Sequence, residues 1–147
     1  MRFRYPLQKI VDLKGSEKSM AEWQYAASLG QLRNEEKKLG ELLAERKRAE
    51  DQMANLAASS VTLAELTNLQ LYLEALDVKI RMQEQGVKTA EILVQERRKA
   101  LADKTVEEKV WLTAREKAYE KFRYEMLVMQ QNELDELAMV RYVRARA

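Results

Sequence analysis

The sequence predicts an all-α protein, a long antiparallel two-helix coiled-coil hairpin with unequal arms. Composition is the first observation: Ala, Glu, Leu, Lys and Arg supply 83 of the 147 residues, which is typical of coiled coils and very long helices. The second is the scarcity of turn formers, with four Gly and one Pro. A compact domain of this length needs several turns, which usually use Gly, Pro, Asn and Asp, so we expect only one or two.

The residues that most often carry catalysis and bind metals are absent, because the chain has no His and no Cys. General acid–base catalysis at neutral pH usually uses His, and zinc sites use Cys or His. We therefore expect no enzymatic activity, no cofactor and no metal site. The net charge of +2 is too small for a nucleic-acid-binding surface over the whole molecule. We expect no nucleic-acid partner, and a basic RNA-binding hairpin stays as a weak alternative.

The sequence also predicts a cytoplasmic protein. Its longest apolar runs are far shorter than a membrane span, and the amino end carries charges at Arg2, Arg4 and Lys9 in place of the apolar core of a secretory signal. The lack of Cys agrees with a reducing compartment.

The first helix is expected from about residue 6 to about residue 58. Pro6 suits the first turn of a helix, where its missing N–H has no partner to lose. Apolar residues at alternating steps of three and four predict the contact seam of a coiled coil. The seam assigned in this way is Leu29, Leu32, Leu39, Leu43, Met53 and Ala57, preceded by a looser row at Leu7, Ile10, Leu13, Met20 and Trp23.

A turn is expected at about residues 59–62, followed by a second helix from about residue 63 to about residue 143. Thr62 and Glu65 have the spacing of a capping box, which starts a helix. A helix of about 80 residues would be roughly 120 Å long. Its predicted seam is Leu66, Leu69, Leu73, Leu76, Ile80, Val87, Ala90, Val94 and Leu101, continuing to Trp111, Ala118, Phe122, Met129, Met139 and Val143.

The two predicted arms differ in length. If the turn centres near residue 60, the numbers of facing residues sum to about 120, because both helices rise equally. Residues beyond about 117 would then have no partner within the chain. Exposed apolar surface of this kind marks an interaction site, so we expect another protein, a second copy or a short third helix to cover it. The apolar residues concerned are Tyr119, Phe122, Tyr124, Met126, Leu127 and Met129.

Two further features suggest binding surfaces. Leu71, Tyr72 and Ala75 lie off the predicted seam near the turn, where they either bind a protein or pack beneath the connecting turn. The segment 137–147 has Arg at 141, 144 and 146 and no acidic residue. Such a block either docks on an acidic surface or supplies ordinary charge near a helix carboxyl end.

Three stretches resemble a known family, the flagellar export protein FliJ family, the stalk-like component of the flagellar type III export ATPase complex. Residues 3–14 (FRYPLQKIVDLK), followed by Glu17, resemble the family's opening pattern. Residues 69–80 (LQLYLEALDVKI) are similar to its segment after the turn, and residues 133–138 (ELDELA) to its carboxyl-terminal segment. The order and spacing of the three, and the position of the turn, carry the resemblance over nearly the whole chain.

The resemblance implies a non-enzymatic stalk. Members of the family form an antiparallel coiled coil that docks in the centre of the FliI-type export ATPase hexamer and promotes its assembly. They contact the cytoplasmic domain of the export gate protein FlhA and handle export chaperones. The expected location is therefore cytoplasmic, peripheral at the inner face of the cell membrane through these partners. The alternatives are a self-associating coiled-coil scaffold and the stalk of a virulence-type secretion system.

The resemblance also implies site residues. Its gate-binding surface falls on Tyr72, Leu76 and Leu42. Leu69 and Leu71 stand where the family usually has Tyr and Gln, so this chain departs from the pattern there. For the ATPase ring we expect contacts from the apolar and basic ends of the chain, namely Phe3, Tyr5, Leu7, Phe122, Met129, Arg141 and Arg144.

Overall fold

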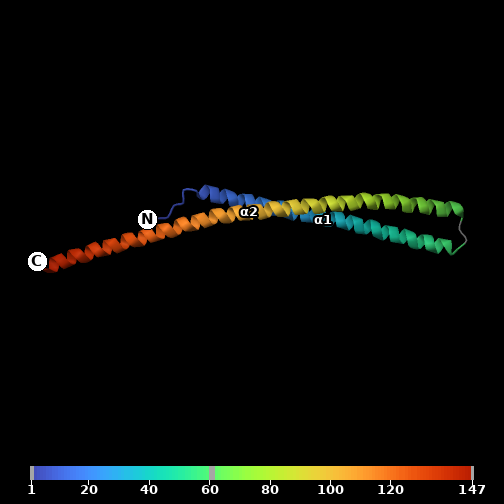
Figure 1. Ribbon diagram of the computed structural model, residues 1–147. Helices are drawn as coiled ribbons and strands as arrows, with labels where there is room; N and C mark the ends of the chain where they lie inside the picture. Colours follow the sequence, from blue (N-terminus) through green and yellow to red (C-terminus); the bar gives the residue numbers. More distant parts are fainter. Residues whose placement is uncertain (1, 60–61, 147) are drawn as a thin grey trace. The chain divides into compact units, whose positions relative to one another are not determined.

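The computed structural model describes residues 2–59 and 62–146 and contains two α-helices (Figure 1). Helix α1 spans Gln8–Ala57 (50 residues) and α2 spans Leu63–Arg146 (84 residues). No strand occurs in the described ranges. The predicted all-α class with two unequal helices is therefore confirmed. Ser60 and Val61 of the predicted turn lie outside the described residues.

Helix α1 starts where the sequence signals predict, just after the only proline. Pro6 and Leu7 form a turn, in which the Gln8 amide donates to the Tyr5 carbonyl at 3.1 Å. The Val11 amide then donates to the Leu7 carbonyl at 3.2 Å. The helix begins two residues later than the predicted start near residue 6 and ends one residue before the predicted end near 58.

Helix α2 begins with the predicted cap. Thr62 precedes the helix, and its Oγ1 accepts a hydrogen bond from the Glu65 amide at 3.3 Å, which satisfies one of the free donors of the first turn. Glu65 places a negative charge in that turn, where the helix dipole favours it. The helix begins at the predicted residue and ends three residues beyond the predicted position 143.

Two compact units divide the chain, and each contains part of both helices. The turn unit comprises Met20–Ala102, and the terminal unit comprises Met1–Ser19 with Asp103–Ala147. In each unit α1 and α2 lie side by side and run in opposite directions (Figure 1). The described interhelical contacts lie within one unit or the other, so each unit has its own part of the helix–helix interface.

In the turn unit, α2 buries the row of apolar residues that its sequence predicts. Leu76 is the largest fully buried side chain of the described residues, at 1 % exposed. Polar seam positions are satisfied across the interface, as where Gln83 Nε2 donates to the Glu35 carbonyl at 3.0 Å. The α2 seam is thus confirmed here by the burial of Leu76, Ile80, Val87, Ala90 and Val94.

The seam predicted for α1 is wrong at alternate positions. The buried positions of α1 include small side chains, and Ser28, whose Oγ donates to the Tyr25 carbonyl at 2.7 Å, is buried where Leu29 was expected. Leu42 is half-buried, whereas Leu43 is exposed. Small residues let two helices approach closely, so they serve the seam here although apolar patterning favours larger neighbours. The buried residues of α1 are Val11, Ala21, Ser28 and Ala49.

The looser row predicted upstream is also wrong in most of its members. Trp23 is 81 % exposed, and Leu7, Leu13 and Met20 are exposed as well, whereas Ile10 is half-buried. Charged residues and a glycine on α1 face α2 instead of this apolar row. They are Lys14, Gly15, Glu17 and Lys18, which are half-buried. Neither helix, over the described residues, has a stretch long and apolar enough to cross a membrane.

Candidate functional site

The predicted gate-binding residues occupy three different environments in the turn unit. Tyr72 is 43 % exposed, Leu42 is half-buried, and Leu76 lies inside the helix–helix seam. A partner protein can therefore touch Tyr72 and the rim of Leu42 without disturbing the hairpin. Leu76 packs between α1 and α2, so a partner cannot reach its side chain while the two helices stay together.

The ring of Tyr72 is held by a hydrogen bond across the two helices. Its hydroxyl donates to a carboxylate oxygen of Glu45 on α1. This hydrogen bond is the main cause that raises the pKa of the Tyr72 phenol, and partial burial and the negative charge of Glu45 act in the same direction. The phenol therefore stays protonated, and its aromatic face is presented at a fixed position. A shallow depression adjoins it, lined by Gln52, Leu56, Glu65, Asn68, Leu69 and Tyr72.

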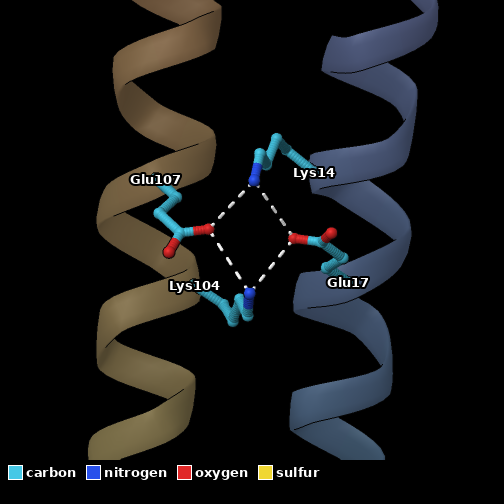
Figure 2. A network of polar contacts seen from close by, with 4 residues as sticks. All are labelled: Lys14, Glu17, Lys104 and Glu107. Carbon is cyan, nitrogen blue, oxygen red and sulfur yellow. Dashed lines mark hydrogen bonds and ion pairs between the residues drawn. The ribbon is translucent and has the colours of Figure 1, made fainter.

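In the terminal unit, four charged side chains form a closed ring of alternating sign between the two helices (Figure 2). Lys14 Nζ lies 3.4 Å from Glu17 Oε2 and 3.2 Å from Glu107 Oε2. Lys104 Nζ completes the ring at 3.2 Å from Glu17 and 3.4 Å from Glu107. We call these four residues the ionic ring. It joins the helices at a level where a coiled coil normally places apolar residues.

The ionic ring shifts the protonation equilibria of its members. The hydrogen bond from Lys104 is the largest cause that lowers the pKa of Glu17, and the hydrogen bond from Lys14 is the largest that lowers the pKa of Glu107. The hydrogen bond to Glu17 raises the pKa of Lys104 in return. These three pKa shifts all favour the charged forms, so Glu17, Glu107 and Lys104 stay ionised at neutral pH.

A glycine lies next to the ionic ring and faces a charged side chain of α2. A Cβ placed on Gly15 would lie 3.2 Å from Glu108 Oε2. Glu108 in turn pairs with Lys18, whose Nζ lies 3.3 Å from Glu108 Oε1. A side chain at position 15 would require the flexible end of Glu108 to move slightly, so Gly15 leaves room for this ion pair.

The ionic ring predicts an acid-sensitive stability. Because Glu17 and Glu107 have folded pKa values below the ordinary 4.5, their contribution is fully present above pH ~4.5 and is lost as pH falls through the lowered values. The melting temperature should therefore fall less between pH 7 and pH 3 in the double variant Glu17→Gln with Glu107→Gln than in the parent chain. Circular dichroism measures both values. Glu22→Gln is the control, since Glu22 makes no ion pair in the described part of the chain. An unchanged pH dependence in the double variant would contradict this role.

The residues before α1 fold onto α2, which the sequence did not predict. The Phe3 ring lies 5.2 Å from the Tyr119 ring and 5.3 Å from the Phe122 ring, both measured between centroids. The Arg115 guanidinium lies 5.8 Å from the centroid of Phe3, within cation–π range. The expectation that residues beyond about 117 have no partner in the chain is therefore wrong for Tyr119 and Phe122.

The residues predicted to contact an ATPase ring separate into two groups. Phe3, Tyr5 and Phe122 are half-buried, and Phe3 and Phe122 pack against each other. The remaining residues are exposed. This second group consists of Leu7, Met129, Arg141 and Arg144.

The last twenty described residues of α2, Leu127–Arg146, are exposed along their whole length. Arg144 and Arg146 place positive charge in the final turn, where the helix dipole favours it. The Arg146 guanidinium lies 5.3 Å from the centroid of the Tyr142 ring. We call this segment the free end of α2. It has acidic residues at 133, 135 and 136 and Arg at 141, 144 and 146. Its large apolar residues are Leu127, Val128, Met129, Leu134, Leu137, Met139, Val140, Tyr142 and Val143.

Sequence reasoning missed the ionic ring, although a signal existed. Lys104 continues the spacing of the predicted α2 seam, where charged residues are unusual, and Glu107 lies one residue before its next position. Lys14 and Glu17 have matching opposite charges on α1, close to the level that the predicted pairing assigns. A search for opposite charges at facing positions of the two predicted helices would have located the ionic ring. A search for apolar periodicity alone does not detect it.

Comparisons with known proteins agree with this architecture. A curated relative, the Flagellar FliJ protein of Bacillus subtilis (strain 168), is 22 % identical over 143 residues, which cover 97 % of each chain. A solved structure of a chain described as a YscO homologue from Chlamydia trachomatis superposes with a TM-score of 0.66 at 18 % identity, covering 95 % of this chain and 94 % of that one. At this identity the solved structure supports the fold.

The family itself is established by a match over almost the whole sequence. The family model described as Flagellar FliJ protein matches residues 3–147. That range includes the Phe3 contact, the ionic ring, Tyr72 and the free end of α2. The chain belongs to the Flagellar FliJ protein family.

Proposed function

We propose that this chain is a non-enzymatic central-stalk component of the flagellar type III protein export apparatus. In this role it docks in the export ATPase ring, promotes assembly of that ring, and contacts the cytoplasmic domain of the export gate FlhA. Membership of the family supports a part in flagellar export. The observation that carries the stalk role is the free end of α2, which is a helix without a partner among the described residues.

The last turns of the free end of α2 have a wide apolar surface. Leu137, Met139, Val140, Tyr142 and Val143 are all exposed, and consecutive helical residues point in directions about 100° apart. These five side chains cover about 220° of the helix surface, and Ala138 and Arg141 occupy the remainder. An apolar surface of this width favours burial on most sides, and the central hole of a ring of subunits would provide such an enclosure.

The turn unit supplies the proposed contact with the gate. Tyr72 presents an exposed aromatic ring whose hydroxyl is fixed by Glu45, and Leu42 lies half-buried on α1. Aromatic side chains held in one position are favoured as binding hot spots because little conformational entropy is lost on binding. Leu76 supports this surface from within the seam. Export chaperones are further proposed partners, and binding to all of these would hold the chain at the inner face of the cell membrane.

Replacing the exposed aromatic gives a direct prediction for the gate. Tyr72→Asp should lower the affinity for the cytoplasmic domain of FlhA at least about tenfold, because the aromatic contact is lost and a charge enters the interface. The measurement is isothermal titration with the full-length chain. Tyr72→Phe is the matched control, since it keeps the ring and removes only the hydrogen bond to Glu45. An affinity for Tyr72→Asp equal to that of the parent chain would remove Tyr72 from the site.

The stalk role as a whole is tested with the cognate export ATPase. The full-length chain should co-purify with the ATPase at low salt and increase its rate of ATP hydrolysis, because a stalk that promotes assembly raises the fraction of complete rings. Absence of both binding and stimulation would contradict the proposal. A stable dimer of the chain at low micromolar concentration would favour the alternative of a self-associating scaffold.

A further inference from the structure

Helix α2 carries a second row of residues with coiled-coil spacing, which takes no part in the contact with α1. The row begins at Leu71 and ends at Ile92, and the steps between its members alternate between four and three. All of its members are exposed, and none is charged, in a chain of which 34 % is charged. We call this row the outer stripe; it consists of Leu71, Ala75, Val78, Met82, Gln85, Thr89 and Ile92.

The outer stripe lies on the face of α2 that is turned away from α1. At 100° per residue, the centre of the stripe is about 150° around the helix axis from the centre of the seam. Exposure agrees with this geometry, because Met82 is 71 % and Ile92 60 % exposed, whereas Leu76 and Ile80 of the seam are 1 % and 7 % exposed. The same helix thus has two surfaces with the spacing that packs against a helix, and the hairpin uses one of them.

The polar members of the outer stripe do not interrupt its apolar character. The Thr89 hydroxyl donates to the Gln85 carbonyl at 3.0 Å, so its polar atom is satisfied within α2. The stripe also has a defined end, since the next two positions of the same spacing are charged, Glu96 and Lys99. From Leu71 to Ile92 the stripe is about 32 Å long, which is sufficient for a stable two-helix contact.

The residues that flank the outer stripe are mainly basic. Arg81, Lys88 and Glu74 follow one side, and Lys79 follows the other side. Neither Lys79 nor Lys88 has a carboxylate within 4.0 Å in the described part of the chain, and Arg81 Nε donates to the backbone carbonyl of Asp77 at 3.4 Å. Flanking charges of a coiled coil select the partner by complementarity. The flanks of this stripe therefore favour an acidic partner.

We propose that the outer stripe docks one amphipathic α-helix of another protein, whose apolar row follows the same spacing and whose flanks are acidic. A helix is the occupant because alternating steps of three and four keep the same side chains facing a partner only when that partner is itself helical. This interaction is independent of the export role proposed above. Its core positions include neither Tyr72, which flanks Leu71 and is held by Glu45, nor the free end of α2.

Pairing of two copies through the outer stripe gains less from the flanking charges than binding of an acidic helix. In an antiparallel pair centred on the stripe, Glu74 of each copy would meet Lys88 of the other, but Arg81 would meet Arg81. In a parallel pair, Glu96 and Lys99 would each face the same residue of the second copy at a core position. Like charges that face each other destabilise a coiled coil, so a helix of opposite flanking charge is the better occupant.

The test uses a synthetic helical peptide, four heptads long, with Leu at its core positions and Glu at its flanking positions. A matched peptide has Lys in place of Glu, and neither peptide pairs with itself, because its own flanks repel. Binding of each labelled peptide to the full-length chain is followed by fluorescence anisotropy. We expect the Glu peptide to bind at least about tenfold more tightly than the Lys peptide, a difference of about 1.4 kcal/mol.

Variants of the chain locate the binding on the outer stripe. Met82→Glu should weaken binding of the Glu peptide at least about tenfold, whereas Val110→Glu, at an equally exposed position of α2 outside the stripe, should leave it unchanged. Lys79→Glu combined with Lys88→Glu should reverse the preference towards the Lys peptide. Circular dichroism confirms that each variant keeps its helix content, as expected for exposed positions.

Several outcomes would overturn the proposal. Equal affinity for both peptides would remove the charge selection, and equal affinity of the Met82→Glu and parent chains would place the binding elsewhere. A dimer of the parent chain in sedimentation, dissociated by Met82→Glu, would show that a second copy occupies the stripe. Because Met82 lies outside both proposed export surfaces, loss of peptide binding with intact ATPase and gate binding would separate this proposal from the proposed function.

Discussion

Leu76→Ala is expected to lower the free energy of unfolding by about 2–5 kcal/mol. Leu76 is 1 % exposed and is the largest fully buried side chain of the described residues. Its removal loses the transfer free energy of the buried methyl groups and leaves a cavity between α1 and α2. With only two helices to relax around it, the hairpin has few neighbouring side chains to fill that space.

The measurement is urea denaturation followed by the helical circular dichroism signal. Val78→Ala is the matched control on the same helix, because Val78 is 49 % exposed, and it should cost less than about 1 kcal/mol. A second pair tests the α1 register, since Leu42→Ala should cost more than Leu43→Ala. Equal costs within either pair would contradict the helix–helix interface described above.

Two charges placed on the free end of α2 are expected to abolish its docking in the export ATPase. Val140→Asp combined with Val143→Asp should weaken binding to the cognate ATPase at least about a hundredfold, or about 2.8 kcal/mol. Both residues are exposed in the chain alone, so the substitutions should leave the hairpin folded. An enclosing ring would bury the new carboxylates without partners, which is unfavourable.

The control for this prediction places the same substitutions elsewhere on α2. Val106→Asp with Val110→Asp changes two similarly exposed valines outside the free end and should leave ATPase binding unchanged. The free-end variant should also keep its affinity for the gate domain, since Tyr72 lies in the other unit. Undiminished ATPase binding of the free-end variant, or an equal loss in the control, would contradict insertion of this segment.

The sequence predicted α2 well and α1 less well, for a physical reason. The seam of α2 consists of Leu, Ile and Val at regular steps, so apolar periodicity identifies it directly. The seam of α1 uses Ala21, Ser28 and Ala49, which have little hydrophobic signal of their own. Large residues next to the true seam, such as Leu29 and Leu43, also have coiled-coil spacing. The predicted seam therefore differed from the observed one by one residue at every second position.

Some features of the candidate sites depend on residues that are close in the sequence, and others depend on residues that are far apart in it. The exposed Tyr72 near the turn and the basic last turns of α2 were predictable because they depend on residues close together in the sequence. The contact of Phe3 with Phe122 was not, since it depends on where the segment before α1 returns to α2. The burial of Leu76 agrees with its place in the predicted seam, and its part in gate binding stays a prediction.

The proposed insertion of the free end of α2 into the ATPase ring is directly measurable, because the lack of Cys allows a single label to be placed. Ala138→Cys in the free end and Ala54→Cys in the last turns of α1 each accept a single photo-crosslinking label. Mixed with the cognate export ATPase, the label at position 138 should cross-link to the inner surface of the ring, and the label at position 54 should not. Cross-linking from position 54 without cross-linking from position 138 would contradict the account.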